Sequence, residues 1–160
     1  MFVLCFAANP ELRARLPRCS DRDASASRNR GRVLAKILVV EDNEQLGALL
    51  VERLERRGHS LLHAEDAGAA FAAAKASQPD VILLDQQLRG QEDWAVARAL
   101  KYDDHTRAIP IIALMGANSD EARDAARQAG CDEFHPKPLD FGRLLQQIDA
   151  VTPAPEAETA

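Results

Sequence analysis

The sequence contains no long apolar segment, only three cysteines and few aromatic residues. No apolar run approaches the roughly 20 residues that a transmembrane helix requires, so we expect no membrane span. Cys5, Cys19 and Cys131 form an odd, sparse set without metal-ligand spacing, which predicts free thiols in a reducing compartment. The apolar opening MFVLCFAA is short and has no basic residues before it, so it is a poor secretory signal. We therefore expect a cytoplasmic protein.

Charge is distributed unevenly along the 160 residues. Residues 1–35 hold seven arginines against three carboxylates, although the whole chain has a formal net charge of −5. Because these arginines are mixed with serine, asparagine and proline, we interpret residues 1–34 as a disordered basic leader. Contact between this segment and nucleic acid, or a start codon placed too far upstream, are the alternatives. We expect one folded domain over residues 35–151 and a flexible tail over residues 152–160.

From Lys36 onward, five short apolar runs alternate with segments of helical composition. The runs are KILVV (36–40), HSLLHA (59–64), VILLD (81–85), IPIIALM (109–115) and CDEFH (131–135). Strands that alternate with helices indicate βαβ units and a parallel sheet. The near-continuous apolar character of residues 37–40 and 81–84 is typical of strands covered on both faces. The pattern therefore predicts the α/β class with a doubly wound parallel sheet.

Polar residues mark where the intervening helices should begin. The expected caps are Asn43 for the first helix, Asp66 for the second, Asn118 or Ser119 for the fourth and Asp140 for the fifth. The fourth helix is unusual because its apolar stripe consists only of alanines: Ala122, Ala125, Ala126 and Ala129. Alanine buries less apolar surface than leucine, and each Å² contributes only about 25 cal/mol, so this helix should be weakly anchored. We predict that segment 119–129 is the most mobile helix.

Acidic and basic side chains follow the ends of three expected strands. Glu41 and Asp42 come directly after the first strand, and Asp85 ends the third. Lys137 follows the fifth strand. In an open parallel sheet, ligands bind beyond the carboxyl ends of strands, where the strand order reverses. With strand order 2-1-3-4-5, the first and third strands are neighbours about 4.8 Å apart, so Asp42 and Asp85 should face one another.

Carboxylates brought so close repel one another and resist ionising together. A divalent cation and an ammonium group relieve this repulsion, and a set of oxygen ligands favours Mg²⁺ or Mn²⁺. The alternative is that Asp42 and Asp85 only cap the turns that follow their strands. The placement of all four charged residues at the appropriate strand ends favours the cation site.

The strings KILVVEDN, VILLD, IPIIAL and FHPKPLD, taken together, resemble the response-regulator receiver domain. The chemotaxis and cell-cycle single-domain regulators are the nearest type, and the resemblance covers residues 36–151. It implies the flavodoxin-like receiver fold, with five parallel strands in the order 2-1-3-4-5, in a signalling protein that is not an enzyme. It also implies that a histidine kinase or a histidine phosphotransfer protein donates a phosphoryl group to this chain.

The resemblance makes Asp85 the phosphoacceptor. Asp42, Asp85 and the backbone carbonyl of Gln87 would bind Mg²⁺ or Mn²⁺, and Glu41 would assist through water. Lys137 would neutralise the phosphoryl oxygens, and the peptide bond that follows it is expected to be cis. Output would pass by protein contact to a downstream target, through the face of the fourth helix, the fifth strand and the fifth helix, without a DNA-binding domain.

The chain departs from the family pattern at the end of the fourth strand, where the family has Thr or Ser and this chain has Met115. A thioether donates no hydrogen bond, and loss of one donor in a charged site costs about 1.5–3 kcal/mol. Phe134 occupies the place of the family's rotating aromatic, and an ordinary core ring is the alternative. Arg89 stands where the family favours a proline. We therefore expect atypical switching, and the alternative is a degenerate receiver that acts as a phosphorylation-independent interaction module.

Other interpretations of a doubly wound sheet fit this sequence poorly. A phosphatase with an aspartate nucleophile needs a second acidic residue two positions later, where this chain has Gln87. A flavodoxin needs a phosphate-binding loop rich in Ser, Thr and Gly after the first strand, where this chain has EDNEQ. The histidines lack metal-ligand spacing and are expected at ordinary surface or strand positions: His59, His63, His105 and His135.

Overall fold

The computed structural model describes residues 34–90, 94–116 and 119–152, and within them five strands alternate with five helices. The strands are β1 (Lys36–Val40), β2 (Ser60–Ala64), β3 (Val81–Asp85), β4 (Ile111–Met115) and β5 (Glu133–Pro136). The helices are α1 (Glu44–Glu55), α2 (Ala67–Ser77), α3 (Ala95–Tyr102), α4 (Asp120–Gln128) and α5 (Phe141–Val151). All strand pairs are parallel in the order β2-β1-β3-β4-β5, which confirms the predicted fold class. The expected leader and tail lie outside the described residues, except for Leu34 and Thr152.

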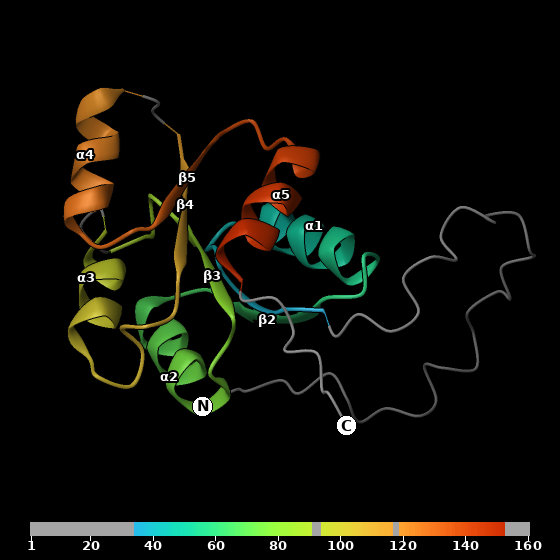
Figure 1. Cartoon of the computed structure of the whole chain (residues 1–160), viewed down its shortest axis with the longest axis horizontal. Coiled ribbons are helices and arrows are strands. Elements are labelled where there is room, and N and C mark those ends of the chain that lie inside the picture. The colour runs from blue at the N-terminus through green and yellow to red at the C-terminus, as the bar shows by residue number, and fades with distance from the viewer. Residues whose placement is uncertain (1–33, 91–93, 117–118, 153–160) are drawn as a thin grey trace, which may run out of the picture. The chain divides into compact units, whose positions relative to one another are not determined.

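Helices cover both faces of the sheet (Figure 1). α1 and α5 lie on one face, and α2, α3 and α4 lie on the other. Side chains of β1 alternate between two cores: Ile37 and Val39 belong to the core under α1 and α5, whereas Leu38 and Val40 belong to the opposite core. β3 and β4 are buried along their whole length, as expected for strands covered on both faces. None of the helices in the described ranges is long and apolar enough to cross a membrane.

Local polar residues fix where the helices begin. The side-chain oxygen of Asn43 accepts hydrogen bonds from two backbone N–H groups in the first turn of α1. Asp66, Ser119 and Asp140 each accept one such bond at the start of α2, α4 and α5. The predicted caps are therefore confirmed, while Asn118, the other candidate for α4, lies outside the described residues.

α4 is anchored by a narrow strip of small side chains. Ala126 and Ala129 are buried and Ala122 is half-buried, but Ala125 is exposed, so its predicted place in the apolar stripe is wrong. The reason is geometric, because residues 122, 126 and 129 follow the i, i+4, i+7 spacing of one face and residue 125 lies beside it. Cys131, just after α4, is a buried free thiol, and burial raises its pKa to about 12.

Candidate functional site

The carboxyl ends of β1 and β3 bring three carboxylates together. Val40 pairs with Leu84 in the sheet, so the residues that follow β1 lie beside the residue that ends β3. Glu41, Asp42 and Asp85 each place one oxygen within 4.8 Å of the others. Glu41 and Asp85 are buried, whereas Asp42 is half-buried. The structure therefore brings Asp42 and Asp85 together, as the strand order led us to expect.

Lys137 reaches this acidic group from the segment after β5. Its Nζ atom lies 2.6 Å from Oδ1 of Asp85 and 3.7 Å from Oε2 of Glu41. Its backbone N–H donates to the carbonyl oxygen of Met115, which holds the segment against the end of β4. The peptide bond between Lys137 and Pro138 is cis, as expected. One ammonium group thus lies against two of the three carboxylates.

Glu41 has the least favourable environment for a charge in this group. Burial raises the pKa of Glu41, and the charges of Asp85 and Asp42 raise it further, while the N–H of Asn43 and the ammonium of Lys137 act against the rise. Oε1 of Glu41 accepts the Asn43 N–H at 3.0 Å. Oε2 is buried and has no hydrogen-bond partner among the described residues. Such an oxygen, facing two other carboxylates, fits a hard divalent cation or its bound water, because these cations take oxygen ligands.

The other predicted site residues lie on the strands and loops next to this acidic group. Gln87 is exposed in the loop after β3, and a ligand role for its carbonyl stays a prediction. Met115 ends β4 and is only 1% exposed. Phe134, on β5, is half-buried against the core cluster that contains Met115. The guanidinium carbon of Arg127, in α4, lies 5.5 Å from the centre of the Phe134 ring. Phe134 is therefore a partly exposed ring in contact with α4 and not an enclosed core residue.

Arg89 is a partner of the acidic group that sequence reasoning missed. It lies in the loop after β3, and its backbone N–H donates to Oδ2 of Asp42 at 3.0 Å. Its Nε atom lies 3.5 Å from the same oxygen. The only signal in the sequence was the replacement of the family's proline, because proline has no N–H and no charge whereas arginine offers both.

His63, on β2, contacts the backbone of the acidic segment. Its Nε2 atom lies 2.9 Å from the carbonyl oxygen of Glu41, and because a carbonyl only accepts, this nitrogen carries the hydrogen. Gly47, in α1, leaves room for the ring, since a Cβ there would lie 2.5 Å from Nε2. The expectation of an ordinary strand position overlooked this contact, because the three residues come from different segments and no periodicity links them.

A family model for the response regulator receiver domain matches residues 37–149. The chain belongs to this family. It is 33% identical over 118 residues to protein PilH of Pseudomonas aeruginosa, a match that covers 74% of this chain and 98% of PilH. It is 31% identical over 112 residues to the polar-differentiation response regulator DivK of Brucella anthropi, which covers 70% of this chain and 91% of DivK.

The fold of this receiver domain is similar to that of the Vibrio cholerae chemotaxis protein CheY4. The TM-score is 0.70 at 24% identity, and the match covers 74% of this chain and 98% of the CheY4 chain. Membership of the receiver family makes the chain a two-component signalling protein rather than an enzyme, and it implies a histidine kinase as partner. The acidic group of Glu41, Asp42 and Asp85 is consistent with the Mg²⁺ site of a receiver.

Proposed function

We propose that this receiver domain accepts a phosphoryl group on Asp85 from a histidine kinase or a histidine phosphotransfer protein. The observation that supports this proposal most directly is the 2.6 Å contact between Nζ of Lys137 and Oδ1 of Asp85. The carboxylates of Glu41 and Asp42 lie beside this contact. A nucleophilic carboxylate and a cation that can neutralise a phosphoryl group thus meet at one edge of the sheet.

In the proposed reaction, a carboxylate oxygen of Asp85 attacks the phosphorus of a phosphohistidine. The phosphorus–nitrogen bond breaks, its electron pair returns to the imidazole, and an aspartyl phosphate forms. Such a transfer depends on positioning and on electrostatic stabilisation more than on further covalent chemistry. Lys137 provides one positive charge against the phosphoryl oxygens, and it lies at Asp85 before the donor arrives.

A divalent cation would complete this charge balance. Asp42, Asp85 and the backbone carbonyl of Gln87 would hold Mg²⁺ or Mn²⁺, with Glu41 acting through water. When bound, the cation neutralises negative charge on the phosphoryl oxygens. Oε2 of Glu41 is buried and accepts no hydrogen bond from the described residues, which supports this donor set, because a water bound to the cation would donate to it.

Output by protein contact, through α4, β5 and α5, is the second part of the proposal. The match covers nearly the whole of PilH and of DivK, which supports output through the surface of the receiver domain itself. We expect the coupling between Asp85 and this face to be atypical. Asp85 pairs with Leu114, so the next residue of β4, Met115, adjoins the site, and its buried thioether offers no donor to a phosphoryl group.

Labelling with radioactive acetyl phosphate and Mg²⁺ tests the phosphoacceptor. We expect the wild-type chain to carry label that resists washing, and we expect Asp85→Asn to lose at least nine-tenths of that label, since an amide is a poor nucleophile. Asp104→Asn is the matched control, because Asp104 is an exposed aspartate paired with Arg107 in the segment between α3 and β4. Equal labelling of the wild type and Asp85→Asn would exclude Asp85 as the acceptor.

A receiver that binds partners without phosphorylation is the second candidate, and buried Met115 is the observation that favours it. The same experiment separates the two candidates. If the wild type takes no label with Mg²⁺ or Mn²⁺, and partner capture is equal with and without phosphodonor, the interaction module replaces the phosphoacceptor.

A further inference from the structure

Asp42 is held by two donors from a single residue. Oδ2 of Asp42 accepts the backbone N–H of Arg89 at 3.0 Å, and the Nε atom of the same arginine lies 3.5 Å away. Asp42 is one of the three carboxylates that meet at the ends of β1 and β3. Lys137 contacts the other two, so each carboxylate of the acidic group has a basic side chain beside it.

We propose that Arg89 is a built-in counter-ion for Asp42 that opposes cation binding and so sets the divalent-cation affinity of the site. This inference rests on the proposed function, because it assumes that Asp42 is a cation ligand. A guanidinium within a few Å of a ligand oxygen repels an incoming divalent cation and lowers the negative charge that attracts it. The cation must therefore bind against this repulsion or displace the guanidinium from Asp42.

The surroundings of Arg89 keep the free-energy cost of that displacement low. A polar hollow beside Asp42 is lined by six residues: Asp42, Asn43, Glu44, Gln45, Glu65 and Arg89. Arg89 is the one basic residue in this lining, and Glu44 and Glu65 offer it two other carboxylates. A guanidinium that leaves Asp42 thus stays in an acidic environment. The guanidinium can therefore leave Asp42 and remain close to other negative charges, which makes the contact reversible.

The size of the effect follows from exposure. The Arg89 side chain is 90% exposed, whereas that of Asp42 is 17% exposed. Ion pairs with an exposed partner are worth at most about 1 kcal/mol, which corresponds to an affinity change of about two- to fivefold. The backbone N–H of residue 89 survives any substitution other than proline, so a side-chain variant tests the charge alone. Salt should weaken the effect, because the Debye length falls to about 3 Å at 1 M ionic strength.

Titration with Mn²⁺, followed by the electron paramagnetic resonance signal of the free ion, tests the inference without any phosphorylation step. We expect Arg89→Ala to lower the dissociation constant of Mn²⁺ by about two- to fivefold at low ionic strength. The difference from the wild type should shrink in high salt. Arg89→Lys keeps the positive charge and should retain an affinity close to that of the wild type.

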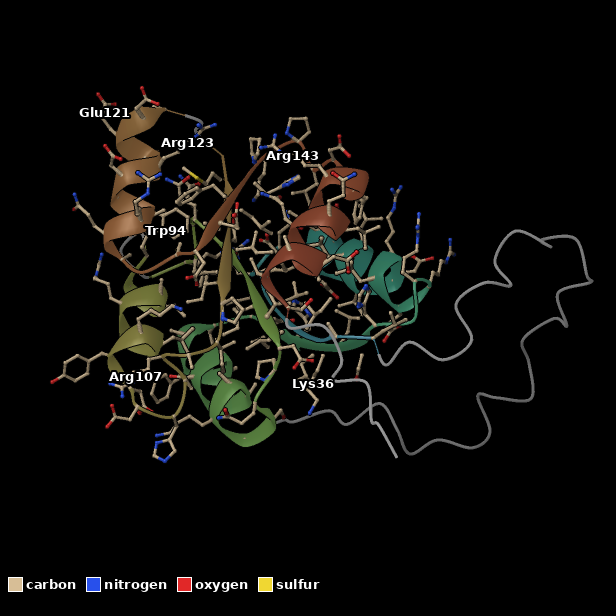
Figure 2. The ribbon with its side chains drawn as sticks, in the orientation of Figure 1. Lys36, Trp94, Arg107, Glu121, Arg123 and Arg143 are labelled. Carbon is tan, nitrogen blue, oxygen red and sulfur yellow. The ribbon has the colours of Figure 1, made fainter. Side chains whose placement is uncertain are left out.

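Arg107→Ala is the matched control. Like Arg89, Arg107 is exposed and paired with an aspartate, in this case Asp104 at 3.0 Å. Arg107 precedes β4 and so lies toward the amino ends of the strands, whereas the acidic group lies at the carboxyl ends of β1 and β3. In Figure 2, Arg107 is low in the view, far from Glu121, which lies in the first turn of α4 at the top. Loss of one positive charge at that distance should leave Mn²⁺ affinity unchanged, so a general change in net charge is controlled.

The outcomes separate this inference from the proposed function on which it rests. If Asp42→Asn abolishes Mn²⁺ binding but Arg89→Ala leaves the affinity unchanged or weaker, the counter-ion role of Arg89 is wrong and the cation site stands. If neither the wild type nor Arg89→Ala binds Mn²⁺, the cation site fails, and the role of Arg89 fails with it. Mn²⁺ binding by Arg89→Ala but not by the wild type would support the counter-ion role of Arg89 most strongly. Circular dichroism of each variant confirms that the comparison is between folded proteins.

Discussion

α1 and α5, on one face of the sheet, and α4, on the other, bury side chains of very different size. Under α1 and α5, the large helix side chains that are fully buried are Leu50, Leu54, Leu144 and Ile148. In α4, on the other face, the one buried residue is Ala126. Since buried apolar area governs how firmly an element is held, α1 and α5 should be rigid, whereas α4 should separate from the sheet at little cost.

This difference in anchoring coincides with a division within the proposed function, between the acidic group and the output face. Asp42 lies in the segment that leads into α1, whose cap, Asn43, also donates its N–H to Glu41. The acidic group is therefore tied to the well-anchored face. The proposed output face includes α4, which contacts the half-buried Phe134 ring through Arg127. The acidic group, which must hold its geometry, thus adjoins a helix with much buried apolar area. The output face, which must change, includes a helix with little.

The largest expected effect on stability comes from shortening a buried side chain of α1. Leu54→Ala should lower the free energy of unfolding by about 2–5 kcal/mol, because Leu54 is fully buried and its removal leaves a cavity. Ala126→Gly, the corresponding change in α4, should cost only about 1 kcal/mol, chiefly through helix propensity. Urea unfolding followed by circular dichroism measures both. Equal losses in the two variants would contradict the difference in anchoring between α1 and α4.

Most of the fold could be predicted from the sequence because its signals are local. Apolar runs bounded by polar residues gave all five strands, and the caps at Asn43, Asp66, Ser119 and Asp140 hold their helices as expected. The convergence of Asp42 with Asp85 could also be predicted, since parallel strands end at the same edge. In each case, either neighbours in the chain or one rule of topology decides the outcome.

The features that sequence reasoning missed depend on contacts between distant segments. Arg89 and Asp42 are 47 residues apart, and the conformation of the loop after β3 decides that they meet. His63 lies against Gly47 because two elements pack closely at that point, which no periodicity reveals. Ala125 looked equivalent to its neighbours in α4, yet it lies beside the face that carries residues 122, 126 and 129 and is exposed.

Met115→Thr is expected to strengthen the coupling between Asp85 and the proposed output face that contains α4. Threonine supplies a hydroxyl donor beside Asp85, and a hydrogen bond to a charged group contributes about 1.5–3 kcal/mol. The smaller side chain also frees space in the core cluster against which Phe134 packs. NMR shifts induced by beryllofluoride at Phe134 and along α4 should therefore be larger in Met115→Thr than in the wild type.

Met115→Leu is the control for this experiment, because leucine is similar in size to methionine and has no hydroxyl. It should respond to beryllofluoride as the wild type does. If Met115→Thr, Met115→Leu and the wild type all show equal shifts, the missing donor does not limit coupling between Asp85 and the output face.

The smallest expected effect is a difference in local opening within the unmodified protein. Backbone amides of α4 should exchange with solvent deuterium about tenfold or more faster than those of α1, equivalent to about 1.4 kcal/mol in opening free energy. The reason is that opening α4 exposes small side chains, chiefly Ala126 and the adjoining Ala129, whereas opening α1 exposes Leu50 and Leu54. Mass spectrometry of peptides that cover each helix measures the exchange. α5, which buries Leu144 and Ile148, is the internal control and should resemble α1. Protection of α4 equal to that of α1 and α5 would mean that a strip of alanines anchors a helix as well as leucines do. α4 would then not be more loosely held than the helices on the other face.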